Sequence, residues 1–229
     1  MWSRLADGLI DALGLASPPI AVSFCDEVPA GLRRVDRAVP SGCTFWKLAG
    51  EGEVFYTEPS DHHGCPIGAH THAVPLGPAG SEQLGQMLTM MADIDYVRPA
   101  EVPAIPTLKA PFRFAVYAPL AAAPVAPDVV LLRGTPRQLM VAAEAARAAG
   151  LESPLPGRER PTCAMIPEVL ATEHGQSSYG CIGNRVYTGL PDGESYFAVP
   201  GRHLEAFAEK AAAMASANRQ LEEFHRARL

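Results

Sequence analysis

The chain has 229 residues, of which 48% are hydrophobic and 19% are charged, and its formal net charge is −6. This length can bury a sizeable core without disulfides, and an acidic chain without basic runs argues against a nucleic-acid or anionic-membrane surface. No apolar stretch approaches the roughly 20 residues of a membrane-spanning helix, and the first residues lack a secretory signal pattern. We therefore expect a soluble, cytoplasmic protein that binds neither nucleic acid nor membranes.

The first half of the chain predicts two helices, a strand and a long loop. Leu5, Leu9 and Leu13 share one helical face, and Gly14 is a typical residue to end the helix that carries them. In chain order we expect a helix over 3–13, a strand over 20–24, a turn or short helix over 41–50, a loop over 56–80, and a helix from Ser81 with Leu84, Leu88 and Met91 on one face.

The second half alternates strands and helices. Thr135 and Pro136 are a typical cap and first-turn pair, and Leu204, Phe207, Ala211, Met214 and Leu221 predict the buried stripe of a C-terminal helix. The expected elements are strands over 112–117 and 129–132, a helix over 136–149, a loop over 151–161, a strand over 195–199, and a helix after Pro200. This order favours an α/β or α+β fold with a mixed sheet and flanking helices. We expect one compact domain over 1–229, with a proline-rich connection at 99–111 between candidate lobes 1–98 and 112–229.

Four of the five cysteines form two similar pairs in loop or cap contexts. Cys43 precedes Cys65, Cys163 precedes Cys181, and the second member of each pair has a glycine before it and another soon after it. Glycine allows the backbone to turn tightly and to approach a bulky group. If the two halves are related by a pseudo-twofold axis, the four thiols converge between the lobes, and four thiolates can bind a [4Fe–4S] cluster or zinc. Free cysteine is also a common small core residue, which is the role we expect for Cys25.

Histidines gather around Cys65, and an arginine follows Cys181. His62, His63, His70 and His72 surround Cys65 in the sequence, so an imidazole could ligate a metal or act as a base. Arg185 could place a guanidinium at the same site, where it would bind an acidic group or offset the charge of a cluster. Solvated loop histidines and a surface arginine are the plainer alternatives.

The chain resembles a prokaryotic family called domain of unknown function 169. The motifs that carry the resemblance are PPIAVSF at 18–24, Cys43, Cys65 with Gly68, DVVLL at 128–132, PRQ at 136–138, Cys163, GCIGNR at 180–185, and Val199-Pro200. The resemblance implies that Cys43, Cys65, Cys163, Cys181 and Arg185 belong to one site, and it implies no particular reaction. The histidine-rich loop at 61–72 and Asn184 depart from the family pattern.

These observations lead to three functional hypotheses, beside a plain scaffold with reduced, buried cysteines. The first is an iron–sulfur protein, most simply a [4Fe–4S] protein, in which Arg185 tunes charge and His62 or His63 handles protons. Its partner would be a small-molecule substrate or an electron-transfer protein. The second is a non-catalytic zinc- or haem-binding sensor, and the third is a cofactor-free enzyme with Cys65 or Cys181 as nucleophile. Whether the chain is an enzyme and whether it forms a homo-oligomer both stay open.

Overall fold

A six-stranded sheet forms the centre of the protein. The computed structural model describes residues 1–153 and 157–229. The strands are β1 (Ile20–Cys25), β2 (Phe55–Thr57), β3 (Phe114–Pro119), β4 (Val129–Gly134), β5 (Gln176–Ser178) and β6 (Ser195–Pro200). Their spatial order is β2-β3-β1-β4-β6-β5, and each of these neighbouring pairs is antiparallel. Because β1 lies between β3 and β4, both candidate lobes contribute to one sheet.

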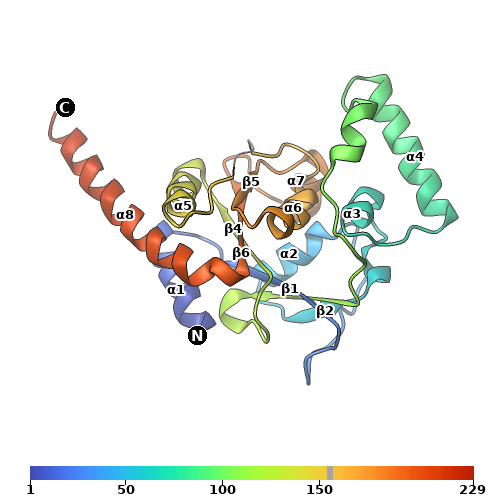
Figure 1. The fold of residues 1–229 in the computed structure, drawn as a ribbon, viewed down its shortest axis with the longest axis horizontal. Helices are drawn as coiled ribbons and strands as arrows, with labels where there is room; N and C mark the ends of the chain where they lie inside the picture. The colour runs from blue at the N-terminus through green and yellow to red at the C-terminus, as the bar shows by residue number, and fades with distance from the viewer. Residues whose placement is uncertain (154–156) are drawn as a thin grey trace.

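Three helices cover one face of the sheet. They are α1 (Trp2–Leu13), α5 (Pro136–Ala148) and α8 (Leu204–Arg226), and the C-terminal part of α8 projects beyond the sheet (Figure 1). Alternate strand residues point to this side, as Val130 and Leu132 do in β4. With Leu9 and Phe207 they form a core without access to solvent.

Short helices cover the opposite face. They are α2 (Cys43–Gly50), α3 (Pro66–Thr71), α6 (Met165–Thr172) and α7 (Ile182–Thr188), together with the one-turn helices η1 (Pro59–His62) and η4 (Thr162–Ala164). Phe45, Trp46 and Ile166 pack there against Tyr117 and Leu131 of the sheet. The remaining one-turn helices are η2 (Pro99–Ala104), η3 (Leu120–Ala122) and η5 (Gly201–His203).

Helix α4 (Pro78–Asp93) lies at the edge of the molecule, away from the sheet (Figure 1). None of its residues is buried, although Leu84, Leu88 and Met91 give it an apolar side. An apolar helix face outside a core usually meets either a ligand cavity or a partner. In this protein the apolar side of α4 lines a cavity.

The structure confirms the α/β class with flanking helices and most of the predicted elements. The sheet, predicted to be mixed, is antiparallel throughout, because all its neighbouring strands run in opposite directions. The loop predicted over 56–80 is wrong in part, since it contains η1 and α3 and since α4 begins at Pro78 rather than Ser81. The buried stripe predicted for α8 ends at Ala215, because Leu221 lies in the projecting part and is 55% exposed. Part of the loop predicted over 151–161 falls on 154–156, outside the described residues. None of the described helices combines the length and apolar character that a membrane crossing would need.

Candidate functional site

Four cysteines line one cavity of about 640 Å³ on the α2/α3/α7 side of the sheet. Cys43 is the first residue of α2, Cys65 caps α3, and Cys181 caps α7, while Cys163 lies in η4 directly before α6. The fifth cysteine, Cys25, ends β1 and lines a different hollow. Cysteines that are far apart in sequence therefore share one cavity wall.

Helix packing brings the two pairs together. Helix α2 packs against α7, and α3 packs against η4, so each contact joins a segment of the first pair to a segment of the second. The Cys181 backbone N–H donates to Thr162 Oγ1 at 2.5 Å, which ties the α7 cap to η4. The Gly68 N–H donates to Cys65 Sγ at 3.5 Å, as expected for a cysteine at a helix N-cap.

The glycine before each second cysteine is required by the local backbone. A Cβ on Gly64 would lie 2.3 Å from the Val39 carbonyl oxygen. Gly180 has a φ of +81°, a conformation that L side chains rarely adopt, and a Cβ there would also meet Leu190. Gly68 and Gly183 leave ordinary space for a Cβ, so their freedom is not needed in the same way.

Burial raises the pKa of three cavity thiols, those of Cys43, Cys65 and Cys163. Cys43 and Cys163 are only 8% and 7% exposed. Burial raises the pKa of Cys43 well above its usual value, and it raises the pKa of Cys163 to about 12. It also raises the pKa of Cys65, against two backbone N–H groups that lower it. Among the described residues, no group of three or more His, Cys, Asp or Glu side chains stands ready to hold a single metal ion.

Arg185 holds the backbone around Cys181 and is not among the residues that line the cavity. Its guanidinium donates to the carbonyl oxygens of Gly180, Tyr179, Pro191 and Glu194, at 3.2, 2.5, 3.0 and 3.2 Å respectively. A guanidinium that already donates to four carbonyl oxygens has few N–H groups left to bind an anionic group. The structure thus places Arg185 behind the Cys181 loop.

The histidines of the 61–72 loop divide into two pairs. His62 is buried among aromatic rings, with Nε2 2.9 Å from Thr57 Oγ1, and His63 Nε2 lies 3.2 Å from the Pro75 carbonyl oxygen. Neither lines the cavity, whereas His70 and His72 do. Burial lowers the pKa of His62 well below its usual value and that of His72 to about 4. Both buried rings are therefore neutral at pH 7.

Three buried polar side chains of the cavity wall have unsatisfied atoms. Ser41, His72 and Asn184 are at most 3% exposed, yet Ser41 Oγ, His72 Nε2 and both polar atoms of the Asn184 amide have no hydrogen-bond partner. His72 Nδ1 lies 3.0 Å from the Gly68 carbonyl oxygen, which can only accept. The ring hydrogen is thus assigned to Nδ1, and Nε2 is left as an acceptor. These atoms are sealed within the wall rather than open to the cavity, so they mark a costly local arrangement and do not by themselves identify a bound group.

A family model described as uncharacterised ArCR, DUF169, matches residues 8–210 of this chain. The chain belongs to the DUF169 family. No curated protein and no solved structure matches it.

In this DUF169 protein the outer wall of the cavity consists of residues that the sequence analysis did not connect with the cysteines. Leu84, Leu88 and Met91 were predicted only as the face of a helix, and they line the cavity together with Met87, Tyr96, Val97, Val102 and Ile105. Arg158 and Arg160 also line it, although no sequence signal singled them out. The uneven distribution of apolar residues along α4 was the available signal, because such a face must meet something apolar.

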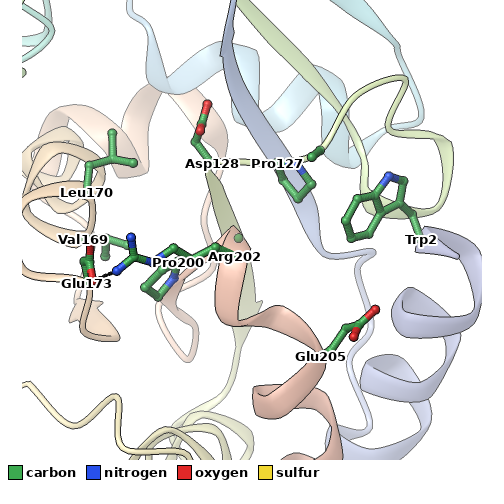
Figure 2. Close-up of a pocket in the computed structure, with 11 residues that line it drawn as sticks. Trp2, Pro127, Asp128, Val169, Leu170, Glu173, Pro200, Arg202 and Glu205 are labelled. Carbon is green, nitrogen blue, oxygen red and sulfur yellow. Dashed lines mark ion pairs between the residues drawn. The ribbon is translucent and has the colours of Figure 1, made fainter.

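Another hollow, distinct from the one beside Cys25 and about 460 Å³ in volume, lies where α1, α6 and the start of α8 meet (Figure 2). Arg202 and Glu173 form an ion pair across it, as the dashed line shows. Asp128 Oδ2 accepts a hydrogen bond from the Phe24 N–H at 2.7 Å. Among the described residues that line it, none carries a buried side-chain atom without a hydrogen-bond partner. The cysteine cavity is therefore the stronger candidate for a functional site.

Proposed function

We propose that this DUF169 protein is an iron–sulfur protein that holds a [4Fe–4S] cluster through Cys43, Cys65, Cys163 and Cys181. The observation that carries the proposal is that these four thiols line one cavity while the fifth cysteine does not. Four thiolates from dispersed parts of a chain are a sufficient ligand set for such a cluster. When bound, the cluster would supply an electron-transfer or substrate-binding centre facing the cavity.

The donor set and its surroundings fit a group that is larger than one ion. In a [4Fe–4S] cluster each thiolate binds a different iron, so the ligands surround the cluster instead of meeting at one point. Soft sulfur ligands select zinc, copper(I) and iron–sulfur clusters over hard cations. Backbone N–H groups such as that of Gly68, directed at Cys65 Sγ, stabilise sulfur that carries negative charge. A bound metal would also favour the thiolate forms of Cys43, Cys65 and Cys163, against the effect of burial on their pKa values.

The remaining site residues take different roles in this proposal. Arg185 positions the Cys181 loop through its carbonyl partners rather than contacting the cluster. His72 lines the cavity and His62 and His63 do not, but its lowered pKa makes it a weak base, so we assign proton transfer to none of these rings. The function in redox chemistry or in binding a small substrate belongs to the proposal as well.

The pKa of Cys65 weighs against this cysteine as a cofactor-free nucleophile. A nucleophilic cysteine needs a lowered pKa, and burial instead raises the pKa of Cys65. Among the described residues no histidine donates to or accepts from Cys65 Sγ, and His62 and His63 bond instead to Thr57 and Pro75. Zinc and haem are the alternatives to an iron–sulfur cluster as the bound group.

The proposal is tested by replacing each cavity cysteine with alanine and comparing it with Cys25→Ala. After anaerobic purification, the expected result is loss of most iron and sulfide in each of the four cavity variants and retention in Cys25→Ala. Circular dichroism establishes which variants are folded. Full iron and sulfide in all four cavity variants, or equal loss in Cys25→Ala, would contradict the assignment. One zinc per chain or a haem absorption band in the wild-type protein would replace the cluster by those alternatives.

A further inference from the structure

We infer that the segment 75–111, which contains α4 and η2, is a lid that opens and closes the cysteine cavity, and that the contact between Arg160 and Tyr96 is its latch. The structure shows the lid closed. Such a lid controls the access of small molecules to the cysteines whatever group these bind, and so goes beyond the proposed function.

The lid segment lies outside both cores of the protein. Among the described residues, none from 75 to 111 is buried, whereas Val74 before the segment and Phe112 after it are only 4% and 8% exposed. Figure 1 shows α4 beyond α3, at the edge of the molecule. A long stretch without buried residues has little packing to hold it in place, which is typical of segments that move while the domain stays folded.

The two ends of the lid are anchored at the same helix. The Val74 N–H donates to the Ala69 carbonyl oxygen and the Leu108 N–H donates to the Thr71 carbonyl oxygen, both at 2.9 Å. Both acceptors belong to α3, which is also the helix that α4 packs against. A segment that leaves and returns at one element can swing about it, because hinges need only a few residues at the ends of elements.

The side of the lid that faces the cavity is apolar. Leu84, Leu88 and Met91 of α4 line the cavity together with Val102 and Ile105, and each of these side chains is half-buried. The four cysteines line the same cavity from the body of the protein. Closure is favoured because it removes this apolar surface from water, and it stays reversible because none of these side chains is fully buried.

Arg160 joins the lid to the body of the protein. Its guanidinium lies 4.5 Å from the centre of the Tyr96 ring and donates to the Tyr96 carbonyl oxygen. Two residues earlier, the Arg158 N–H donates to the Ser177 carbonyl oxygen of β5 at 2.8 Å, so Arg160 is fixed to the sheet. One cation–π contact and one hydrogen bond near the surface are weak, which suits a latch that opens.

The test measures access to the cavity in the full-length protein with and without the latch. Labelling with N-ethylmaleimide at pH 8, followed by mass spectrometry of peptides, reads Cys43 and Cys163 in the cavity, and Cys25 in its separate hollow is the internal reference. We expect Arg160→Met, which removes both latch contacts, to raise the labelling rate of the cavity thiols relative to Cys25 about fivefold or more. Tyr96→Phe keeps the ring and the carbonyl group and should label at the wild-type rate.

Arg228→Met is the matched control. The Arg228 guanidinium lies 5.2 Å from the centre of the Phe224 ring in the projecting part of α8, and neither residue lines the cavity. We expect this variant to change cavity labelling less than about twofold. An unchanged rate in Arg160→Met would overturn the lid, as would the same increase in Arg228→Met or an equal increase at Cys25. If circular dichroism shows that Arg160→Met does not fold, Tyr96→Ala removes the ring alone and should raise the rate about twofold or more.

Iron analysis of the same samples lets the lid and the cluster fail separately. In a preparation that contains iron the thiols are ligated, so the rate of ferrous iron release to bathophenanthroline disulfonate replaces labelling, with the same expected contrast between Arg160→Met and Arg228→Met. Iron that is released equally fast from all variants refutes the lid alone. A preparation without iron whose labelling depends on the latch refutes the cluster and supports the lid.

Discussion

The two faces of the sheet bury different kinds of side chains. No buried polar residue of the described chain comes from α1, α5 or α8, so the buried core on that face is apolar. Polar contacts between α5 and α8, such as Asn218 Nδ2 donating to Glu144 Oε2, lie at its margin. The opposite face contains buried polar groups with unsatisfied atoms, and three of them, Ser41, His72 and Asn184, line the cysteine cavity.

The two faces of the sheet differ in their buried polar atoms. Apolar packing stabilises a fold in proportion to the surface it buries, whereas a buried polar atom without a partner costs free energy. Such atoms in a native protein call for an explanation, such as ordered water, an ion, a ligand or local strain. Both faces bury large apolar side chains, Phe207 and Leu132 on one and Trp46 and Ile166 on the other, so the unsatisfied polar atoms and the cysteine cavity are what set the α2/α3/α7 face apart.

The largest expected effect concerns the apolar face. Phe207 of α8 has no access to solvent and stacks on Phe197 with ring centres 6.3 Å apart. Phe207→Ala should lower the free energy of unfolding by about 3–5 kcal/mol in urea titrations, because it leaves a cavity in a closed core. On the same helix Phe224 is 54% exposed, and Phe224→Ala should change stability by less than about 0.5 kcal/mol. Similar losses in both variants would remove the distinction between buried and projecting parts of α8.

A smaller effect concerns the buried histidines of the α2/α3/α7 face. Burial lowers the pKa of His72 to about 4, whereas histidine in the unfolded chain titrates near 6.5. Unfolding below pH 6.5 therefore takes up a proton, and stability should fall as the pH drops from about 6.5 to 4. For His72 this amounts to about 3 kcal/mol over the interval.

The variant His72→Leu isolates this contribution. Its unfolding free energy, measured in urea at several pH values, should fall less steeply with acidification than that of the wild type. Since carboxylates titrate in both proteins, only the difference between the two curves is attributed to His72. Parallel curves would show that the ring titrates with the same pKa in the folded and the unfolded protein, which would contradict its burial.

The smallest effect tests the unsatisfied atoms directly. Asn184→Leu keeps the side-chain volume nearly constant and removes two polar atoms that have no hydrogen-bond partner. In metal-free protein we expect unfolding free energy to stay the same or rise by about 1 kcal/mol. A loss of more than about 2 kcal/mol would mean that the amide is already satisfied and serves stability.

Much of the fold can be predicted from the sequence. The leucine spacing of α1, the Thr135-Pro136 cap of α5 and the apolar run of β4 each reflect local preferences that the packed structure keeps. The short elements around the cavity cannot be predicted this way. Pro66 lies in the predicted loop over 56–80, yet it occupies the first turn of α3, where proline is well tolerated.

The site depends on contacts that no local pattern contains. The glycine-flanked cysteines indicated a shared site, but the packing of α2 on α7 and of α3 on η4 decides which residues face the cavity. Arg185 is near Cys181 in sequence, and its four carbonyl partners direct it elsewhere. In the sequence His72 is one of four clustered histidines. Its burial and its hydrogen bond with the Gly68 carbonyl oxygen distinguish it only in the folded structure.

The central claim is that the four cavity cysteines hold one iron–sulfur cluster. Iron, sulfide and zinc analysis of anaerobically purified wild-type protein, with a visible spectrum of the same sample, tests it most directly. We expect about four iron and four sulfide per chain and a broad sulfur-to-iron charge-transfer band. A colourless protein with neither iron nor sulfide would contradict it.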